Sequence, residues 1–138
     1  MAEYKKPVPS PEDPLLTQPF WEATKRHEVV IPRCKKCNYY FWYPRQACPK
    51  CLQEDWEWVK TDGKARLHTF TVVRQPGNPN FADDVPYAYA IVQLEEGVRL
   101  ISNIVGCKIP DDLQVDMPLV PSFDDITPEY TLLKFKPA

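Results

Sequence analysis

Four of the five cysteines occur as two CxxC pairs, and cysteine thiolates at this spacing bind zinc. The pairs are Cys34 with Cys37 and Cys48 with Cys51. Each pair brings two sulfur atoms round one turn, so two pairs on facing hairpins complete a tetrahedron around Zn²⁺. Four thiolates leave no open position for water. The sequence therefore predicts a structural zinc site that performs no chemistry.

Two disulfides or a CxxC redox centre are the alternative uses of these cysteines, and iron is the alternative metal. The first residues, MAEYKKPVPSPEDP, are polar and proline-rich and contain no apolar signal segment. Nothing in them directs the chain to an oxidising compartment. We therefore expect a cytoplasmic protein with a reduced, metal-bound site. Cys107 lies outside both pairs and is expected to be an ordinary buried or half-buried thiol.

Charge is unevenly distributed along this chain of 138 residues, whose net charge is −2. Residues 33–51 contain five basic residues and no acidic one, whereas residues 76–138 contain ten acidic and four basic residues. Cations near the cysteines can offset the negative charge of a zinc tetrathiolate. A phosphate-bearing ligand or an acidic partner surface would use the same patch.

Candidate catalytic groups are few. No serine or cysteine occurs in a nucleophile motif. His68 is predicted to share a strand face with Phe70 and Val72, which makes it a packed or interfacial residue, and His27 is expected at the surface near the end of a helix. Neighbouring residues on a strand point apart, which favours solvated turns over an acid/base pair for Asp83 with Asp84 and Asp111 with Asp112. We expect a chain that is not an enzyme on its own.

The amino-terminal region must form an arm. Residues 1–14 contain four prolines and predict an extended segment. Helical spacing of apolar residues from Leu15 to Glu28 predicts a short amphipathic helix, with Pro19 in its first turn. Phe20 and Trp21 on this helix should pack on the chain's own body or on another subunit.

Five consecutive aromatic residues, 39–43, separate the two cysteine pairs. On a hairpin, Tyr40 and Trp42 would share one face and the other three residues the opposite face. Both faces should then be covered. The alternative is a stacking platform for nucleic acid, because basic residues are interleaved with the aromatic ones.

The remaining sequence predicts a mainly β fold. Residues rich in β-branched and aromatic types predict strands at 65–74, 87–94, 98–106, 117–123 and 131–136. Five short strands interrupted after the third indicate a small Greek-key barrel of the OB type. The long loop 75–86 is a candidate for function. We divide the chain into an extended and helical arm (1–32), a rubredoxin-like zinc ribbon (33–59) and a five-stranded OB-fold barrel (60–138).

The order of these features resembles the DUF35 family of zinc ribbon plus OB-fold proteins. The resemblance rests on the Phe-Trp arm, the PRCxxC and PRxxCPxC ribbon, the glycine before the first barrel strand, VPYAYAIVQLEEGVRLISNIVG, the Met-Pro pair and a closing phenylalanine. It covers the chain from about Leu15 onward. Three positions that are usually glycine are Asn38, Ala65 and Asp116 here, and Asn38 can still take the left-handed conformation of a knuckle turn.

The resemblance implies an accessory subunit of an acyl-CoA enzyme, chiefly a thiolase, and thiolases that act on an aryl-succinyl-CoA are among those it implies. Hydratases, aldolases and hydroxymethylglutaryl-CoA synthase assemblies are the other partners that it implies. The partner would supply the catalytic residues, and the barrel would line part of the CoA path. Arginine and lysine suit phosphate recognition. The candidate CoA-binding residues are Lys64, Arg66, Arg74 and Asn103, and the candidate partner contacts are Phe20, Trp21 and Phe81.

A nucleic-acid-binding protein is the alternative from a different class, because zinc ribbons and OB barrels both bind nucleic acids. Such a groove requires basic residues on the barrel. The acidic composition of the barrel half disfavours it.

Overall fold

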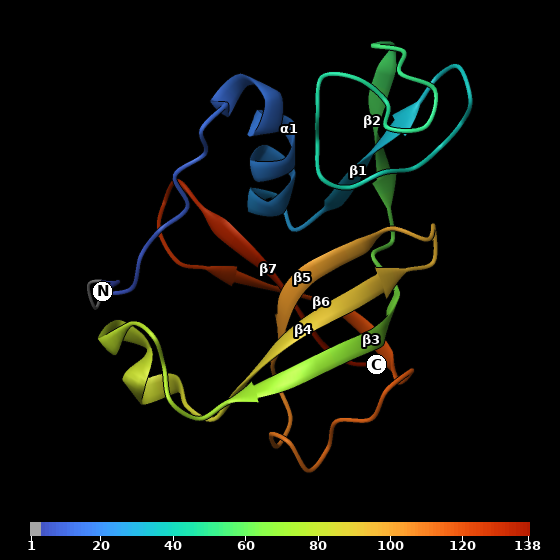
Figure 1. The fold of residues 1–138 in the computed structure, drawn as a ribbon. Coiled ribbons are helices and arrows are strands. Elements are labelled where there is room, and N and C mark those ends of the chain that lie inside the picture. Colours follow the sequence, from blue (N-terminus) through green and yellow to red (C-terminus); the bar gives the residue numbers. More distant parts are fainter. Residues whose placement is uncertain (1–3) are drawn as a thin grey trace.

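The computed structural model describes residues 4–138 and shows a helix, a two-stranded ribbon and a five-stranded barrel (Figure 1). The elements are α1 (Pro14–Lys25), β1 (Val29–Cys34), β2 (Trp56–Thr61), β3 (Ala65–Val73), η1 (Pro79–Asp84), β4 (Tyr87–Leu94), β5 (Arg99–Ile104), β6 (Pro118–Asp125) and β7 (Thr131–Pro137). No helix in the described part of the chain is long and apolar enough to cross a membrane.

Helix α1 has a defined start and end. The Asp13 carboxylate accepts a hydrogen bond from the Leu16 amide at 3.2 Å, and Pro14 occupies the first turn, where its missing N–H costs nothing. The helix ends at Lys25, and His27 follows in the left-handed conformation, with φ of 60°. The placement of Pro19 in the first turn was wrong. The Asp13 cap starts the helix early enough to put Pro19 inside it.

The ribbon sheet consists of β1 and β2, paired antiparallel from Val29 opposite Thr61 to Cys34 opposite Trp56. The intervening loops carry the other cysteines and one isolated bridge, between Arg33 and Tyr40.

The predicted hairpin of aromatic residues is present in a minimal form, because the Cys34 amide donates to the Tyr39 carbonyl at 2.9 Å and the Phe41 amide donates to the Pro32 carbonyl at 3.1 Å. Tyr40 and Trp42 pack against the barrel core, and Phe41 is buried beside the cysteines. Tyr39 and Tyr43 are exposed, so the expectation that both faces are covered was wrong for these two. The predicted separation of Tyr40 and Trp42 from Phe41 is thus observed, although the pairing extends over a single bridge.

The barrel has the strand order β3-β4-β5-β7-β6 and closes through pairing of β3 with β6. Its neighbours are antiparallel except β5 and β7, which are parallel. This is the predicted OB arrangement. A register shift between Leu67 and Thr69 leaves His68 exposed, so the prediction that it packs beside Phe70 was wrong.

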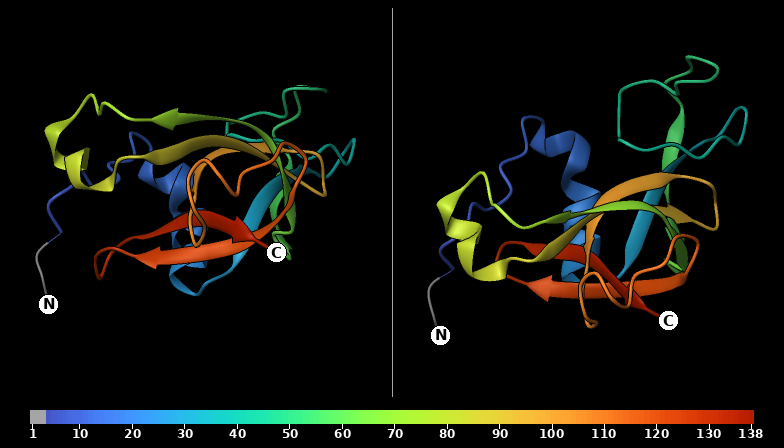
Figure 2. Two further views of the ribbon diagram at one scale, coloured as in Figure 1. Left: turned by 90° about the horizontal axis from the view of Figure 1, so that it is seen from below. Right: turned by 60° about the horizontal axis from the view of Figure 1, so that its bottom comes forward.

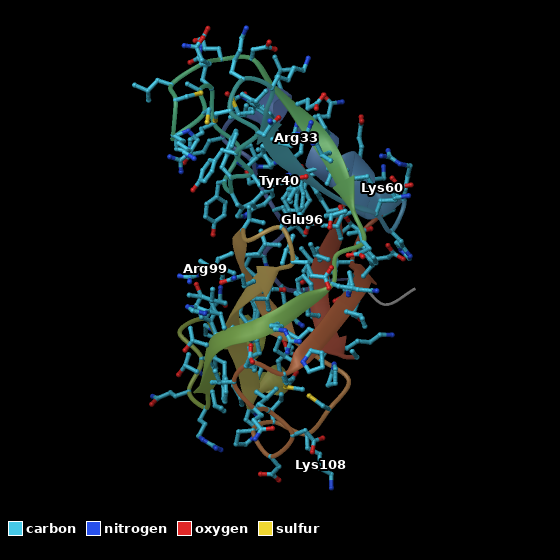
Figure 3. All side chains as sticks on the ribbon, turned by 90° about the vertical axis from the view of Figure 1, so that its right-hand side faces the viewer. Arg33, Tyr40, Lys60, Glu96, Arg99 and Lys108 are labelled. Atoms are coloured by element: carbon cyan, nitrogen blue, oxygen red, sulfur yellow. The ribbon has the colours of Figure 1, made fainter. Side chains whose placement is uncertain are left out.

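The ribbon and the barrel share packing. Val29 and Ile31 of β1 are buried in the same apolar cluster as the barrel residues Leu67, Val92 and Phe135. The link between them includes Gly63, whose φ is +75°. A Cβ at this position would overlap the Pro121 side chain. Figure 3 shows Arg33, Tyr40 and Glu96 in succession from the ribbon down to the barrel.

The long loop after β3 contains η1, which lies at the end of the barrel away from the ribbon loops, as does the amino end (Figure 2). Lys6 of the arm forms an ion pair with Asp84 and lies over the Phe81 ring. The extended arm is thus held against this loop.

Candidate metal centre

The four paired cysteines converge on one point. All four Sγ atoms lie within 4.8 Å of one another, with 3.5 Å between Cys34 and Cys51 and 3.7 Å between Cys37 and Cys48. A regular tetrahedron with Zn–S bonds of about 2.3 Å has edges of about 3.8 Å. The sulfur positions therefore fit Zn²⁺ and leave no room for a fifth ligand.

Two similar turns position these thiols. In the first, the Asn38 amide donates to the Cys34 carbonyl at 2.9 Å, and Asn38 has φ of 62°. In the second, the Leu52 amide donates to the Cys48 carbonyl at 2.9 Å, and Leu52 has φ of 65°. Asn38 thus takes the left-handed conformation expected of it. Leu52 adopts the left-handed conformation although leucine rarely does so, and its residue type therefore did not indicate this turn.

Backbone amides stabilise the thiolate form. The amides of Lys36 and Cys37 donate to Cys34 Sγ at 3.4 and 3.5 Å. The hydrogen bond from the Cys37 amide has the largest influence on the Cys34 thiol, and the pKa of this thiol is lowered to about 7. Burial opposes this shift, and the hydrogen bond from the Lys36 amide adds to it. Phe41 and Trp56 pack against the cysteines, of which Cys34 and Cys48 are buried and Cys37 and Cys51 are half-buried. The site is a closed, structural zinc centre.

The basic patch is partly neutralised by carboxylates of the ribbon. Lys35 lies 3.7 Å from Asp55, and Arg33 lies 3.5 Å from Glu57. Within residues 4–138, Lys36 and Arg45 form no ion pair. Cys107 is half-buried as predicted, and burial followed by the Asp112 charge raises its pKa.

The structure brings together only two of the four candidate CoA-binding residues. Lys64 and Arg66 line a pocket of about 370 Å³ at the side of the barrel. Arg74 lies beyond the opposite end of β3, eight residues after Arg66, which is about 26 Å along a strand that rises about 3.3 Å per residue. Asn103 donates to the Ala88 carbonyl at 2.8 Å.

The candidate partner contacts pack mainly on the chain itself. The Phe20 ring centroid lies 4.9 Å from that of Trp42, and Trp21 lies 5.3 Å from Tyr130. Phe81 lies 6.3 Å from Tyr87. Phe20 and Trp21 still line an apolar groove of about 360 Å³ between α1, the ribbon and the barrel.

Sequence reasoning missed the most exposed apolar residues beside this groove. They are Tyr43, Tyr89 and Ile101, each about half exposed. Strand alternation could have indicated Tyr89 and Ile101, because their neighbours in β4 and β5 are buried.

Comparison with known families supports this description of the fold. Residues 21–57 match the "ChsH2, rubredoxin-like zinc ribbon domain" and residues 58–124 match the "ChsH2, C-terminal OB-fold domain".

Several curated relatives share this arrangement. A "DUF35 domain-containing scaffold protein" of Methanocaldococcus jannaschii is 33% identical over 76% of this chain and 74% of the relative. A "Probable enoyl-CoA hydratase alpha subunit" of Thermomonospora curvata is 38% identical over 86% of this chain. The matched region spans 37% of the length of that hydratase subunit.

Comparison with solved structures also supports the description of the fold. A chain of the structure named "Ltp2-ChsH2(DUF35) aldolase" matches with a TM-score of 0.82 and 34% identity, over 93% of this chain and 98% of the other. With its zinc ribbon and OB barrel, this chain belongs to the DUF35 family.

Proposed function

We propose that this chain is a non-catalytic scaffold subunit of an acyl-CoA enzyme complex, where it contributes to assembly and to binding of the CoA thioester. The observation that carries the proposal is the likeness to the DUF35 chain of "Ltp2-ChsH2(DUF35) aldolase", which extends over nearly the full length of both chains. The relatives named scaffold proteins and hydratase alpha subunit support the same role.

The chemistry of the described residues supports a scaffold. The zinc site is closed by four sulfurs, so the metal has no position for substrate. His27 is engaged by the Asp125 carboxylate at 3.1 Å, and His68 points to solvent from the barrel wall. Reactive groups would therefore come from the partner.

A thiolase-type enzyme is our proposed partner, on the resemblance of the whole motif order. The names of the relatives support a hydratase or an aldolase as the second candidate. All three classes of enzyme act on CoA thioesters. In each class, a scaffold beside the mouth of the active site would exclude water and supply hydrogen-bond donors.

Gentle purification of the chain from its source, with a small tag at the amino end, tests the proposal. We expect an acyl-CoA thiolase, hydratase or aldolase in near-integer ratio by mass spectrometry and light scattering. The identity of the recovered enzyme decides among the three classes. Recovery of the chain alone, or with nucleic acid, would overturn the scaffold role.

Lys64 and Arg66 remain our candidates for contact with the CoA phosphates, because both cations line one pocket. Changing both to Ala should raise the KM of the complex for its CoA thioester more than it lowers kcat, as expected when uniform binding is lost. The control is Lys25→Ala with Lys60→Ala, which removes two exposed cations elsewhere. Equal kinetics for the two double variants would remove Lys64 and Arg66 from the CoA path.

A further inference from the structure

The outer face of β3, β4 and β5 presents an ordered set of side chains to solvent. Cross-strand register aligns Arg66, Gln93 and Arg99 in one row, and Thr69, Ile91 and Ile101 in the next. A third row consists of Thr71, Tyr89 and Asn103. The alternate residues of these strands fill the barrel core, so these rows face outward. We call these nine residues the outer face.

The centre of the outer face is apolar and unusually open. Ile101 is 50% exposed and Tyr89 is 48% exposed. Tyr43 of the ribbon, 49% exposed, extends the same surface, because it lines with Ile101 the groove next to Phe20. Single exposed apolar residues are common, but a contiguous group next to an apolar groove marks an interaction site.

The charge on the outer face is one-sided. It carries two arginines and no carboxylate, although residues 76–138 contain ten acidic residues against four basic ones. Acidic side chains border it only at its edges, where Asp116 lies 3.9 Å from Arg66 and Glu95 occupies the β4–β5 turn.

Arg99 is held ready for an external carboxylate. Its Nε donates to Gln93 Oε1 at 3.0 Å, which fixes the guanidinium on the sheet and leaves its terminal nitrogens available. Within residues 4–138, no carboxylate lies within ion-pair distance of Arg99. In Figure 3, Arg99 lies at the outer side of the barrel, below the ribbon. Guanidinium groups are suited to paired hydrogen bonds with carboxylates.

We propose that the outer face, together with Tyr43, is the surface on which the acyl-CoA enzyme docks, through an apolar strip flanked by carboxylates. This inference rests on the proposed function and names the surface that would perform it. Tyrosine and arginine are among the residue types that provide most of the energy of such interfaces.

A second copy of this chain is a poorer occupant. Two outer faces laid together would bring arginines against a surface that has no carboxylates of its own. Like charges without partners oppose association. The charge pattern therefore requires a different protein with acidic groups.

The test compares matched pairs of variants in the full zinc-loaded chain, titrated with the enzyme that co-purifies with it. Ile101→Asp should weaken the Kd by at least about tenfold, because it places a charge at the centre of the contact. Leu15→Asp, which changes an aliphatic residue 84% exposed in the first turn of α1, should leave the Kd unchanged. Arg99→Glu should slow association most at low salt, and Lys108→Glu is its control.

Each outcome decides one claim. If the face variants bind the enzyme like their controls, the docking surface is wrong while the proposed function stands. If Ile101→Asp converts a dimer of the isolated chain into a monomer and leaves enzyme binding intact, the occupant is a second copy and the inference fails. If the unmodified chain binds no acyl-CoA enzyme, the proposed function itself fails. If circular dichroism shows that Ile101→Asp folds poorly, Tyr89→Ser takes its place in the test.

Discussion

At the residue scale, few side chains carry a large share of the structure, and the zinc ligands come first. Their spacing alone predicted the site, because a tetrahedral ion accepts few arrangements of four thiolates. The sequence indicated the backbone conformations of the turns less clearly. Asn38 and Asp116 take positive φ as their amide and carboxylate types allow, whereas Leu52 does so through the metal turn that it follows.

Cys48→Ser should abolish zinc binding and unfold the ribbon. Apparent zinc binding energy in such modules is about 10–16 kcal/mol and is largely folding energy. The molar ratio of zinc to protein, measured by emission spectrometry, should fall to near zero. Cys107→Ser is the matched control, since this half-buried thiol is not among the ligands, and it should keep its metal. A Cys48→Ser protein that kept both metal and native circular dichroism would contradict the structural role of zinc.

Gly63→Ala should destabilise the junction of ribbon and barrel. The left-handed conformation costs a residue with a Cβ about 1–2 kcal/mol, and the added atom would also overlap Pro121 and crowd Val29. The free energy of unfolding in urea should fall by about 2 kcal/mol or more. At Gly77, where nothing lies within 4 Å of an added Cβ, the same substitution should have little effect. Equal losses at the two glycines would refute this view of the junction.

At the element scale, the regular elements were predictable and the irregular ones were not. The barrel strands were predicted to within about two residues because alternation and turn residues specify them locally. Segment 39–43 pairs with β1 only at the Arg33–Tyr40 bridge, because the cysteine turns and the packing of Phe41 on the metal site, which are non-local, decide its further path. The predicted strand 65–74 already separated Arg74 from Lys64, whereas the pocket shared by Lys64 and Arg66 depends on β6 and the loop before it, which are distant in sequence.

The stability that the chain gains from the contact between His27, which follows α1, and Asp125 of β6 should depend on pH. The Thr131 hydroxyl donates to Asp125 and, with the hydrogen bond from His27, holds the pKa of Asp125 below its usual value of 3.8. A lowered pKa adds stability above the usual value, and this is lost as the pH falls through the folded-state pKa. The free energy of unfolding of Asp125→Asn should therefore lie below that of the unmodified chain at pH 6, and the two should converge as the pH falls through the lowered pKa of Asp125. Asp83→Asn, at an exposed site, should show no such convergence.

At the scale of the whole molecule, the ribbon and the barrel form one packed body. Val29 and Ile31 are buried with the barrel core, and Tyr40 and Trp42 add to that contact. The two family models meet between residues 57 and 58, within β2, so the family boundary does not fall in a flexible linker. A protein built this way can transmit the position of the ribbon to the barrel face and so fix Tyr43 beside Ile101.

This shared core predicts a single unfolding transition, and the distribution of tryptophans allows a direct check. The four tryptophans, Trp21, Trp42, Trp56 and Trp58, all precede the barrel, which begins at Ala65. Tryptophan fluorescence therefore reports on the arm and ribbon, while far-ultraviolet circular dichroism is dominated by the barrel strands. Because both parts bury residues in one cluster, urea titrations followed by the two signals should coincide. Removal of zinc by a chelator should lower both midpoints together, since the ligand stabilises the whole cooperative unit. If the fluorescence transition moved to lower urea while the barrel signal stayed in place, the ribbon would unfold by itself. The surface shared by Tyr43 and Ile101 would then require the partner to order it.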